Sequence, residues 1–224
     1  MPKNQHAEIE WREDGLPVSV QFNDPYFSMH DGLAETRYVY LGGNGLPARF
    51  RPGFQIAELG FGTGLGLMVA VLAWRKCGQS GPLRFTSFEA YPMRTEDMAK
   101  ALEVFPEVQE VAVPILDALS AGQTRIETNH VIAEIVLGDA RETVPQWLHK
   151  ADAWFLDGFA PAQNPELWED PLMQAVADHT APNGTFATYT AAGAVRRSLQ
   201  TAGFDVTRQT GFGRKRHMSI GVLA

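Results

Sequence analysis

A glycine-rich turn between two apolar segments constrains this chain more than any other feature of its sequence. Residues 58–66 read Glu-Leu-Gly-Phe-Gly-Thr-Gly-Leu-Gly. Residues 54–60 are typical of a buried strand, and residues 65–75 are typical of a buried helix. Glycines let the backbone approach a ligand closely, and a helix N-terminus offers it unpaired N–H groups. The turn therefore predicts a ligand site between a strand and a helix.

The alternation of strands and helices continues along the chain. Further strands are predicted over residues 83–89, 131–137, 153–156 and 185–190, and further helices over 95–104, 142–149 and 194–202. The last two strands, 205–209 and 217–223, are joined by too few residues for a crossover helix and should pair antiparallel. We expect an α/β fold with a doubly wound, mostly parallel sheet and one antiparallel terminal strand. Ligands of such a sheet sit beyond the carboxyl ends of its strands.

The first fifty residues have a different pattern. Short strands are predicted at 18–22 and 38–41, with polar and turn-forming residues between them. No linker divides the rest of the chain. We expect one domain over 1–224, in which 1–50 forms an N-terminal flap or small sheet and 51–224 forms the core.

Charge and composition exclude several classes of protein. The net charge of −7 would repel a nucleic acid, so such a partner needs a local basic patch. The single cysteine, Cys77, cannot form an internal disulfide. No apolar run reaches the roughly 20 residues of a membrane span, and the first residues lack a secretory signal. The six histidines show no metal-binding spacing. A cytoplasmic protein without membrane or metal partner is expected.

Carboxylates stand at the carboxyl ends of three of the predicted strands. Glu89 can accept hydrogen bonds from ribose hydroxyls, a property that suits a nicotinamide dinucleotide and S-adenosyl-L-methionine (SAM) equally. Asp139 can accept from an adenine amino group or cap the following helix, and both interpretations stay open. Asp157 stands among aromatic residues, including Phe159, and is the first candidate for chemistry on an amine attached to a flat base.

Positive charge concentrates near the end of the chain. Arg196 and Arg197 open the last long helix, and Arg214, Lys215 and Arg216 follow Phe212 in the terminal hairpin loop. These cations can track phosphates while the ring stacks on a base, or they can form an ordinary solvated turn.

Four segments together resemble one family. They are 24–39, 58–64, 155–161 with Asn164-Pro165, and 211–216, and they are similar to the methyltransferase domain of the tRNA 5-methylaminomethyl-2-thiouridine biosynthesis proteins. The resemblance implies a Rossmann-like class I SAM-dependent methyltransferase. It would methylate the 5-aminomethyl group of the wobble uridine in the anticodon loop of tRNA.

The resemblance also implies roles for individual residues. SAM would be held by Glu58, Gly60, Gly62, Thr63, Gly64, Glu89 and Asp139. Asp157 would orient the acceptor amine and take up charge that develops on its nitrogen. Phe159 and Tyr26 would sandwich the uracil, and Tyr38 or Glu35 would line the mouth of the site.

The best-known members of this family carry a second, FAD-dependent oxidase domain, for which 224 residues leave no room. We therefore expect the stand-alone form, which receives aminomethyluridine from a separate enzyme. Two alternatives remain. An NAD-dependent oxidoreductase is disfavoured because the third glycine of its fingerprint would fall on Leu65 or Leu67. A tRNA-binding module without catalysis is disfavoured by the intact glycine turn and Asp157.

Overall fold

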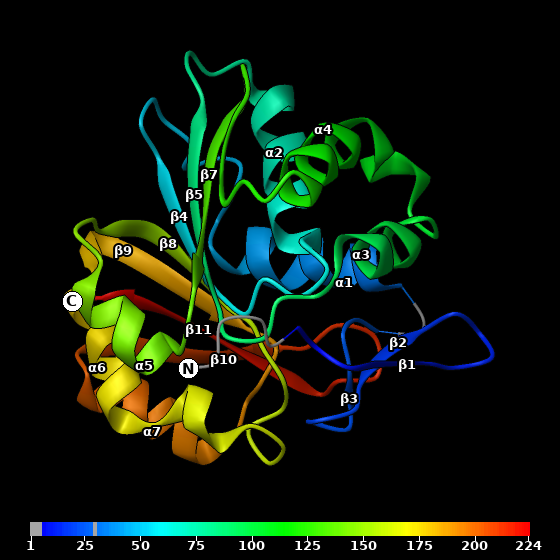
Figure 1. Cartoon of the computed structure of the whole chain (residues 1–224). Coiled ribbons are helices and arrows are strands. Elements are labelled where there is room, and N and C mark those ends of the chain that lie inside the picture. The colour runs from blue at the N-terminus through cyan, green and yellow to red at the C-terminus, as the bar shows by residue number, and fades with distance from the viewer. Residues whose placement is uncertain (1–5, 29–30) are drawn as a thin grey trace.

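The computed structural model describes residues 6–28 and 31–224, and its centre is a large twisted sheet (Figure 1). From one edge to the other, its strands are β10 (Phe204–Thr210), β11 (His217–Leu223), β9 (Thr180–Thr188), β8 (Ala151–Leu156), β4 (Gln55–Leu59), β5 (Leu83–Glu89), β7 (Val131–Leu137) and β6 (Arg125–Glu127). The chain order reverses between β4 and β8, which lie side by side and parallel. Ligands of doubly wound sheets bind at such a switch point.

The direction of the strands agrees with the expected mostly parallel sheet. Neighbouring strands from β9 to β7 run parallel. The predicted antiparallel pairing of the last two strands is confirmed, and β11 lies between β10 and β9. The expectation of a single reversed strand is wrong, because β6 also pairs antiparallel with β7. Its three residues are too few for a periodic signal.

Both faces of the sheet are buried under helices (Figure 1). One face is covered by α2 (Leu65–Cys77), α3 (Thr95–Leu102) and α4 (Gln109–Ser120), and the other by α5 (Ala140–Thr143), α6 (Asp170–Asp178) and α7 (Gly193–Thr201). Along β8, Trp154 packs into one apolar cluster and Phe155 into the other. Because both faces are covered, this strand is buried at every position, Asp152 included, instead of alternating between buried and exposed residues.

Two of these helices lie where no element was predicted. They are α4 and α6, which follow short 3₁₀ turns at Pro106–Val108 and Pro165–Trp168. In α4 the buried residues Val111, Ala112, Ile115 and Leu116 do follow a helical period. Pro114 stands inside this helix and interrupts its hydrogen bonds, which masks that signal in the sequence.

The N-terminal segment forms a small antiparallel sheet and a helical turn. The sheet contains β1 (Ile9–Trp11), β2 (Pro17–Ser19) and β3 (Asp24–Pro25), which confirms the expected small sheet. The strand expected at 38–41 is wrong, because α1 (Gly32–Thr36) continues into a π-helical segment, η1 (Arg37–Gly42). Its residues Val39, Tyr40 and Leu41 are all buried, since the segment packs against α2 and β9. In the described part of the chain, we find no helix whose length and apolarity would suit a membrane span.

Candidate active site

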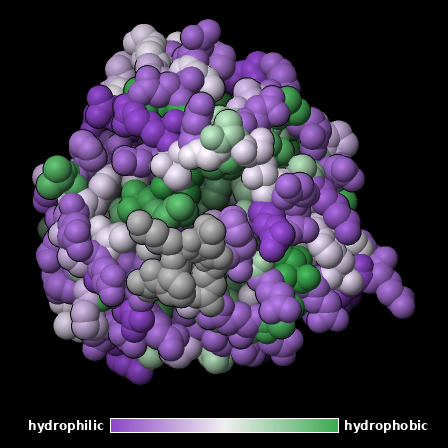
Figure 2. All heavy atoms as spheres, in the orientation of Figure 1, coloured by the Kyte–Doolittle hydropathy of each residue, from purple (hydrophilic) through white to green (hydrophobic). Residues whose placement is uncertain are grey.

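A cavity of about 680 Å³ opens where β4, β5 and β8 end, and the small sheet forms its outer wall. In the space-filling view, an apolar hollow opens near the middle of an otherwise mostly hydrophilic face (Figure 2). The cavity wall includes residues from the N-terminal segment, from the glycine turn, from the ends of β5 and β8, and from the terminal hairpin loop. Segments far apart in the sequence therefore meet at the predicted edge of the sheet.

The glycine turn takes a shape that side chains disfavour. Gly60 and Gly64 have φ angles of +80° and +78°, and Gly64 precedes the first residue of α2. A Cβ atom at Gly60 would lie 3.2 Å from the Cα of Gly158, so the loops after β4 and β8 touch here. Gly62 lies against Tyr26, and Thr63 is buried in the cavity wall.

Glu58 lies beneath this turn with its carboxyl group buried. It accepts a hydrogen bond of 2.7 Å from the Ser87 hydroxyl. Burial raises the pKa of Glu58 well above its usual value, and the bond from Ser87 opposes that shift. A Cβ atom at Gly66 would overlap the Glu58 carboxyl group. The fourth glycine of the motif therefore leaves room for Glu58 inside the first turn of α2.

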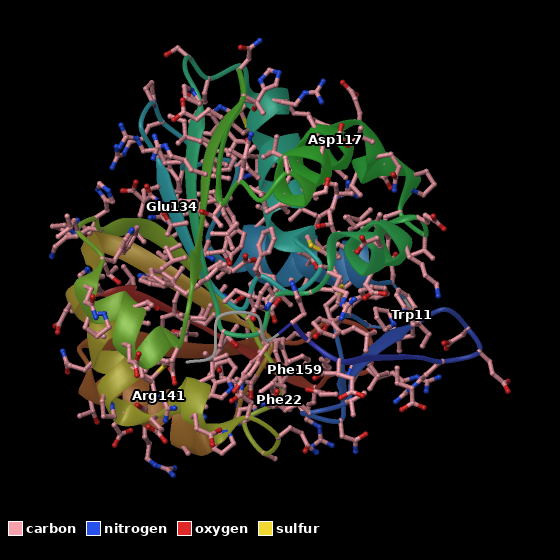
Figure 3. All side chains as sticks on the ribbon, in the orientation of Figure 1. Trp11, Phe22, Asp117, Glu134, Arg141 and Phe159 are labelled. Atoms are coloured by element: carbon pink, nitrogen blue, oxygen red, sulfur yellow. The ribbon has the colours of Figure 1, made fainter. Side chains whose placement is uncertain are left out.

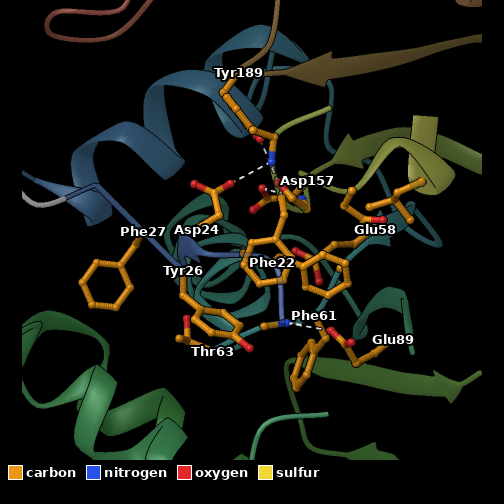
Figure 4. Close-up of a pocket in the computed structure, with 18 of the residues that line it drawn as sticks. Phe22, Asp24, Tyr26, Phe27, Glu58, Phe61, Thr63, Glu89, Asp157 and Tyr189 are labelled. Atoms are coloured by element: carbon orange, nitrogen blue, oxygen red, sulfur yellow. Dashed lines mark hydrogen bonds between the residues drawn. The ribbon is translucent and has the colours of Figure 1, made fainter. Parts of the chain in front are cut away.

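Glu89 lies at the end of β5 and faces the cavity (Figure 4). Its carboxylate accepts the N–H of Gly62 at 3.1 Å and the N–H of Tyr91 at 2.7 Å. Burial raises the pKa of Glu89, while these backbone bonds lower it. Glu89 thus connects the glycine turn to the end of the neighbouring strand.

Asp139 lies on the cavity wall and caps α5 by accepting the N–H of Arg141 at 2.9 Å. The Arg141 guanidinium donates to both of its carboxylate oxygens, at distances down to 2.6 Å. These bonds lower the pKa of Asp139 below its usual range. The structure thus contains the capping interaction that was one of the two interpretations of this residue.

Asp157 follows β8 and lies at the inner end of the cavity (Figure 4). Its carboxylate accepts the N–H of Gly158 at 2.7 Å, and the Tyr40 hydroxyl donates to it. Burial raises the pKa of Asp157 to about 6, against the effect of these two hydrogen bonds. The group is therefore mostly ionised at neutral pH, and its negative charge would attract a cation in the cavity.

Three aromatic rings form the wall between the glycine turn and the small sheet (Figures 3 and 4). Phe159 stacks on Phe22 with ring centroids 4.7 Å apart and meets Tyr26 edge to face at 5.1 Å. Phe159 and Tyr26 are too close and too steeply tilted to hold a base between them. The expected sandwich is therefore not preformed, because Phe22 occupies one face of Phe159.

Glu35, Lys215 and Tyr189 also line the cavity and meet one another. The Lys215 Nζ lies 2.7 Å from a carboxylate oxygen of Glu35 and 4.5 Å from the centre of the Tyr189 ring. The Tyr189 hydroxyl donates to the carbonyl oxygen of Gly158 at 2.9 Å. The loop that contains Lys215 is thereby connected to the turn that contains Asp157.

The remaining predicted residues do not line the cavity. Tyr38 is exposed, its hydroxyl donates to the Thr210 carbonyl oxygen, and its ring lies 5.7 Å from that of Phe212. Arg214 and Arg216 are exposed in the hairpin loop, whereas Arg196 and Arg197 lie on α7, which packs on α6 and β10. Of the five cations grouped from the sequence, Lys215 is the one that reaches the cavity.

Several residues of the cavity wall were not predicted, and four of them matter most for the site. They are Phe22, Asp24, Tyr40 and Tyr189. The Asp24 carboxylate accepts the N–H of Ala160 at 2.8 Å and fastens the small sheet to the loop after β8 (Figure 4). Tyr189 directly follows β9, so the rule that ligands bind at strand ends could have found it. Phe22 and Tyr40 carry no local signal, since packing alone brings them here.

The residues present fit SAM. The positive φ angles of Gly60, Gly62 and Gly64 keep a cradle at the start of α2 that Cβ atoms would fill or strain. Glu89 offers carboxylate oxygens one strand away, where a ribose would lie. Among the described residues, no group of His, Cys, Asp and Glu side chains has the arrangement of a metal site.

Comparison with known proteins identifies the family. The family model described as S-adenosyl-L-methionine-dependent methyltransferase matches residues 104–224. The tRNA 5-methylaminomethyl-2-thiouridine biosynthesis bifunctional protein MnmC of Hahella chejuensis is 41% identical over 233 residues, which cover 99% of this chain and 37% of that protein. The protein of the same name from Idiomarina loihiensis is also 41% identical, over 97% of this chain and 38% of its own length.

The chain thus spans less than two fifths of the length of these relatives. A crystal structure of MNMC2 from Aquifex aeolicus superposes with a TM-score of 0.79 and 27% identity, covering 99% of this chain and 72% of that one. These matches favour a methyltransferase over the NAD-dependent oxidoreductase weighed from the sequence. The chain belongs to the family of S-adenosyl-L-methionine-dependent methyltransferases.

Proposed function

We propose that this chain transfers a methyl group from SAM to the 5-aminomethyl nitrogen of the wobble uridine in tRNA. The observation that carries the proposal is the position of Asp157, at the inner end of a cavity with a glycine cradle and aromatic rings. A carboxylate there suits an amine, and the rings suit a flat base. The two 41% identical relatives are named for the biosynthesis of 5-methylaminomethyl-2-thiouridine in tRNA, and these names point to this substrate.

In this proposal SAM is held by the cradle and the residues around it. These are Glu58, Gly60, Gly62, Thr63, Gly64, Glu89 and Asp139. SAM, when bound, supplies an electrophilic methyl group on a sulfonium. The buried carboxyl of Glu58 supports the turn from below, and Glu89 holds it through the N–H of Gly62.

The amine must present a free lone pair to be methylated. Its pKa should lie near the value of about 10.4 for lysine, so most of it arrives protonated. Asp157 accepts an N–H bond, orients the nitrogen and stabilises the positive charge that develops on it. A carboxylate also favours the protonated amine, so we assign Asp157 positioning and charge stabilisation more than proton removal.

We assign the remaining contacts to the base and the tRNA. Tyr26 and Phe159 contact the uracil, and Glu35 lines the mouth of the site. Tyr38, Arg196, Arg197, Arg214, Lys215 and Arg216 contact tRNA outside the base. We further propose that a separate enzyme supplies the aminomethyluridine, that residues 1–224 act as one methyltransferase domain, and that the reaction takes place in the cytoplasm.

The direct test uses tRNA whose wobble uridine ends in an aminomethyl group. The protein is incubated with this tRNA and isotope-labelled SAM, and the nucleosides are analysed by mass spectrometry. We expect one labelled methyl group on the aminomethyluridine, and none when the same tRNA carries an unmodified uridine. Absence of label from the aminomethyl tRNA, with SAM binding intact, would contradict the proposal.

Removing Glu89 should weaken SAM binding. Glu89→Ala should make the free energy of SAM binding less favourable by about 1–2 kcal/mol, because a charged acceptor bonded to a hydroxyl contributes about that much. Glu89→Gln keeps one acceptor oxygen for the backbone and should lose less. Calorimetric titration with SAM measures both variants, and tRNA affinity should stay unchanged. Parent-like SAM affinity in Glu89→Ala would remove this residue from the cofactor site.

The exposed arginines of the hairpin loop should give tRNA binding its salt dependence. Each phosphate contact adds about 0.7–0.9 to the slope of log K against log salt concentration. Arg214→Ala with Arg216→Ala should therefore flatten the slope by between one and two units. The control variant, Arg84→Ala with Arg125→Ala, removes two exposed cations elsewhere on the main sheet and should leave the salt slope of tRNA binding unchanged. Equal slopes in both double variants would show that tRNA docks elsewhere.

A further inference from the structure

We propose that Lys215 occupies the subsite for the substrate's ammonium group, so that the terminal hairpin loop competes with the substrate from within the chain. The subsite consists of the Glu35 carboxylate and the face of the Tyr189 ring. This inference adds Glu35 and Tyr189 to Asp157 as residues that bind the amine, and it rests on the proposed function for the identity of the natural competitor. Its test uses a simple amine instead of tRNA.

The two side chains of the ion pair differ in exposure. The Glu35 side chain is only 10% exposed, whereas that of Lys215 is 46% exposed. The carboxylate therefore belongs to the wall, and the lysine reaches it from the loop outside. Glu35 is held in α1, whose N-terminus is capped by Asp31. A buried carboxylate needs a cation, and in this structure the lysine supplies it.

The chemistry of the lysine end matches that of the proposed acceptor. Both are primary ammonium groups on a methylene carbon. The Lys215 Nζ lies 2.7 Å from Glu35 and 4.5 Å above the Tyr189 ring, which is a cation–π contact. Its charge also reaches the carboxylate of Asp157, whose pKa it lowers. An aminomethyl group that enters this wall would meet the same partners, and two cations cannot share them.

The hairpin loop, residues 211–216, has free space around Gly213 into which it can move away from Glu35. Gly213 has a φ angle of +57°, and nothing lies within 4 Å of where its Cβ would be. Arg214 and Arg216, on either side of Lys215, are exposed. When a substrate amine takes Glu35, Lys215 is released beside two cations that already face outward. The same lysine then contacts a phosphate, so that amine binding and tRNA binding support each other.

The test measures the affinity of n-butylammonium by NMR titration of isotope-labelled protein, with n-butanol as the uncharged comparison. Lys215→Met keeps the length of the side chain but removes the charge, and it should bind n-butylammonium at least 10-fold more tightly than the parent. Adding Glu35→Gln to this variant should abolish the gain. Arg208→Met, which removes an exposed charge from the neighbouring strand β10, should leave the affinity for n-butylammonium unchanged.

A second measurement uses the unmutated protein. Saturating n-butylammonium should shift the amide signals of residues 211–216, because the loop is displaced, and n-butanol should not. Failure of Lys215→Met to tighten binding, or an unmoved loop in the parent, would overturn the proposal. Because neither measurement involves tRNA, a confirmed amine subsite together with unmethylated tRNA would instead contradict the proposed function alone.

Discussion

Asp157→Asn should slow methyl transfer by about 100-fold or more while SAM binding stays intact. Orientation and electrostatic stabilisation at a reacting centre are typically worth at least that much. The asparagine keeps the shape and an oxygen that can accept the Gly158 N–H, but it loses the charge. A loss close to that of Asp157→Ala would show that charge matters, and a mild loss would show that orientation dominates. Single-turnover rates with SAM saturating measure the difference.

The pH profile provides an independent measure of the same group. Burial raises the pKa of Asp157 to about 6, so kcat/KM should fall as the pH drops through that value in the parent but not in Asp157→Asn. The raised pKa also means that its contribution to stability is fully present below the unfolded value of about 3.9 and is lost as the pH rises through about 6. The Asn variant should therefore be at least as stable as the parent at pH 8. Near-normal turnover in both variants would remove Asp157 from the mechanism.

Gly66→Ala should destabilise the protein, although glycine-to-alanine changes inside helices usually stabilise. The new methyl group would overlap the Glu58 carboxyl group, which is buried and fixed by Ser87. Overpacking of this kind typically costs 1–3 kcal/mol, or a melting temperature lower by about 2–12 °C in a chain of this size. We also expect SAM affinity to fall by about 10-fold, since the cradle is part of the same turn.

In the control for this prediction, Gly66→Ala should stabilise the protein instead of destabilising it. In a Glu58→Ala background the overlap is gone, so Gly66→Ala should stabilise by up to about 1 kcal/mol, the ordinary helical preference for alanine over glycine. Thermal unfolding of the four proteins measures the coupling between the two positions. If Gly66→Ala has the same effect in both backgrounds, Glu58 is not the reason for this glycine.

The sequence alone determined the parallel core and the place of the site. The strands expected at 83–89 and 131–137 became β5 and β7 with the same bounds, since each contains buried apolar residues at alternate positions, as a strand in a covered sheet does. The glycine turn and the carboxylates at the ends of β5 and β8 face one cavity, because parallel strands end at the same edge of a sheet.

Only the tertiary structure decided which distant residues complete that cavity. Tyr38 and Tyr40 stand two positions apart in a segment that resembles a strand, yet Tyr40 is buried at Asp157 and Tyr38 faces the hairpin loop, because the segment is a π-helix. Arg214, Lys215 and Arg216 look alike in the sequence, but one of them meets a buried carboxylate on α1, about 180 residues earlier in the chain. Local patterns contain periodicity and charge, whereas the partner of a side chain depends on which faces the whole fold brings together.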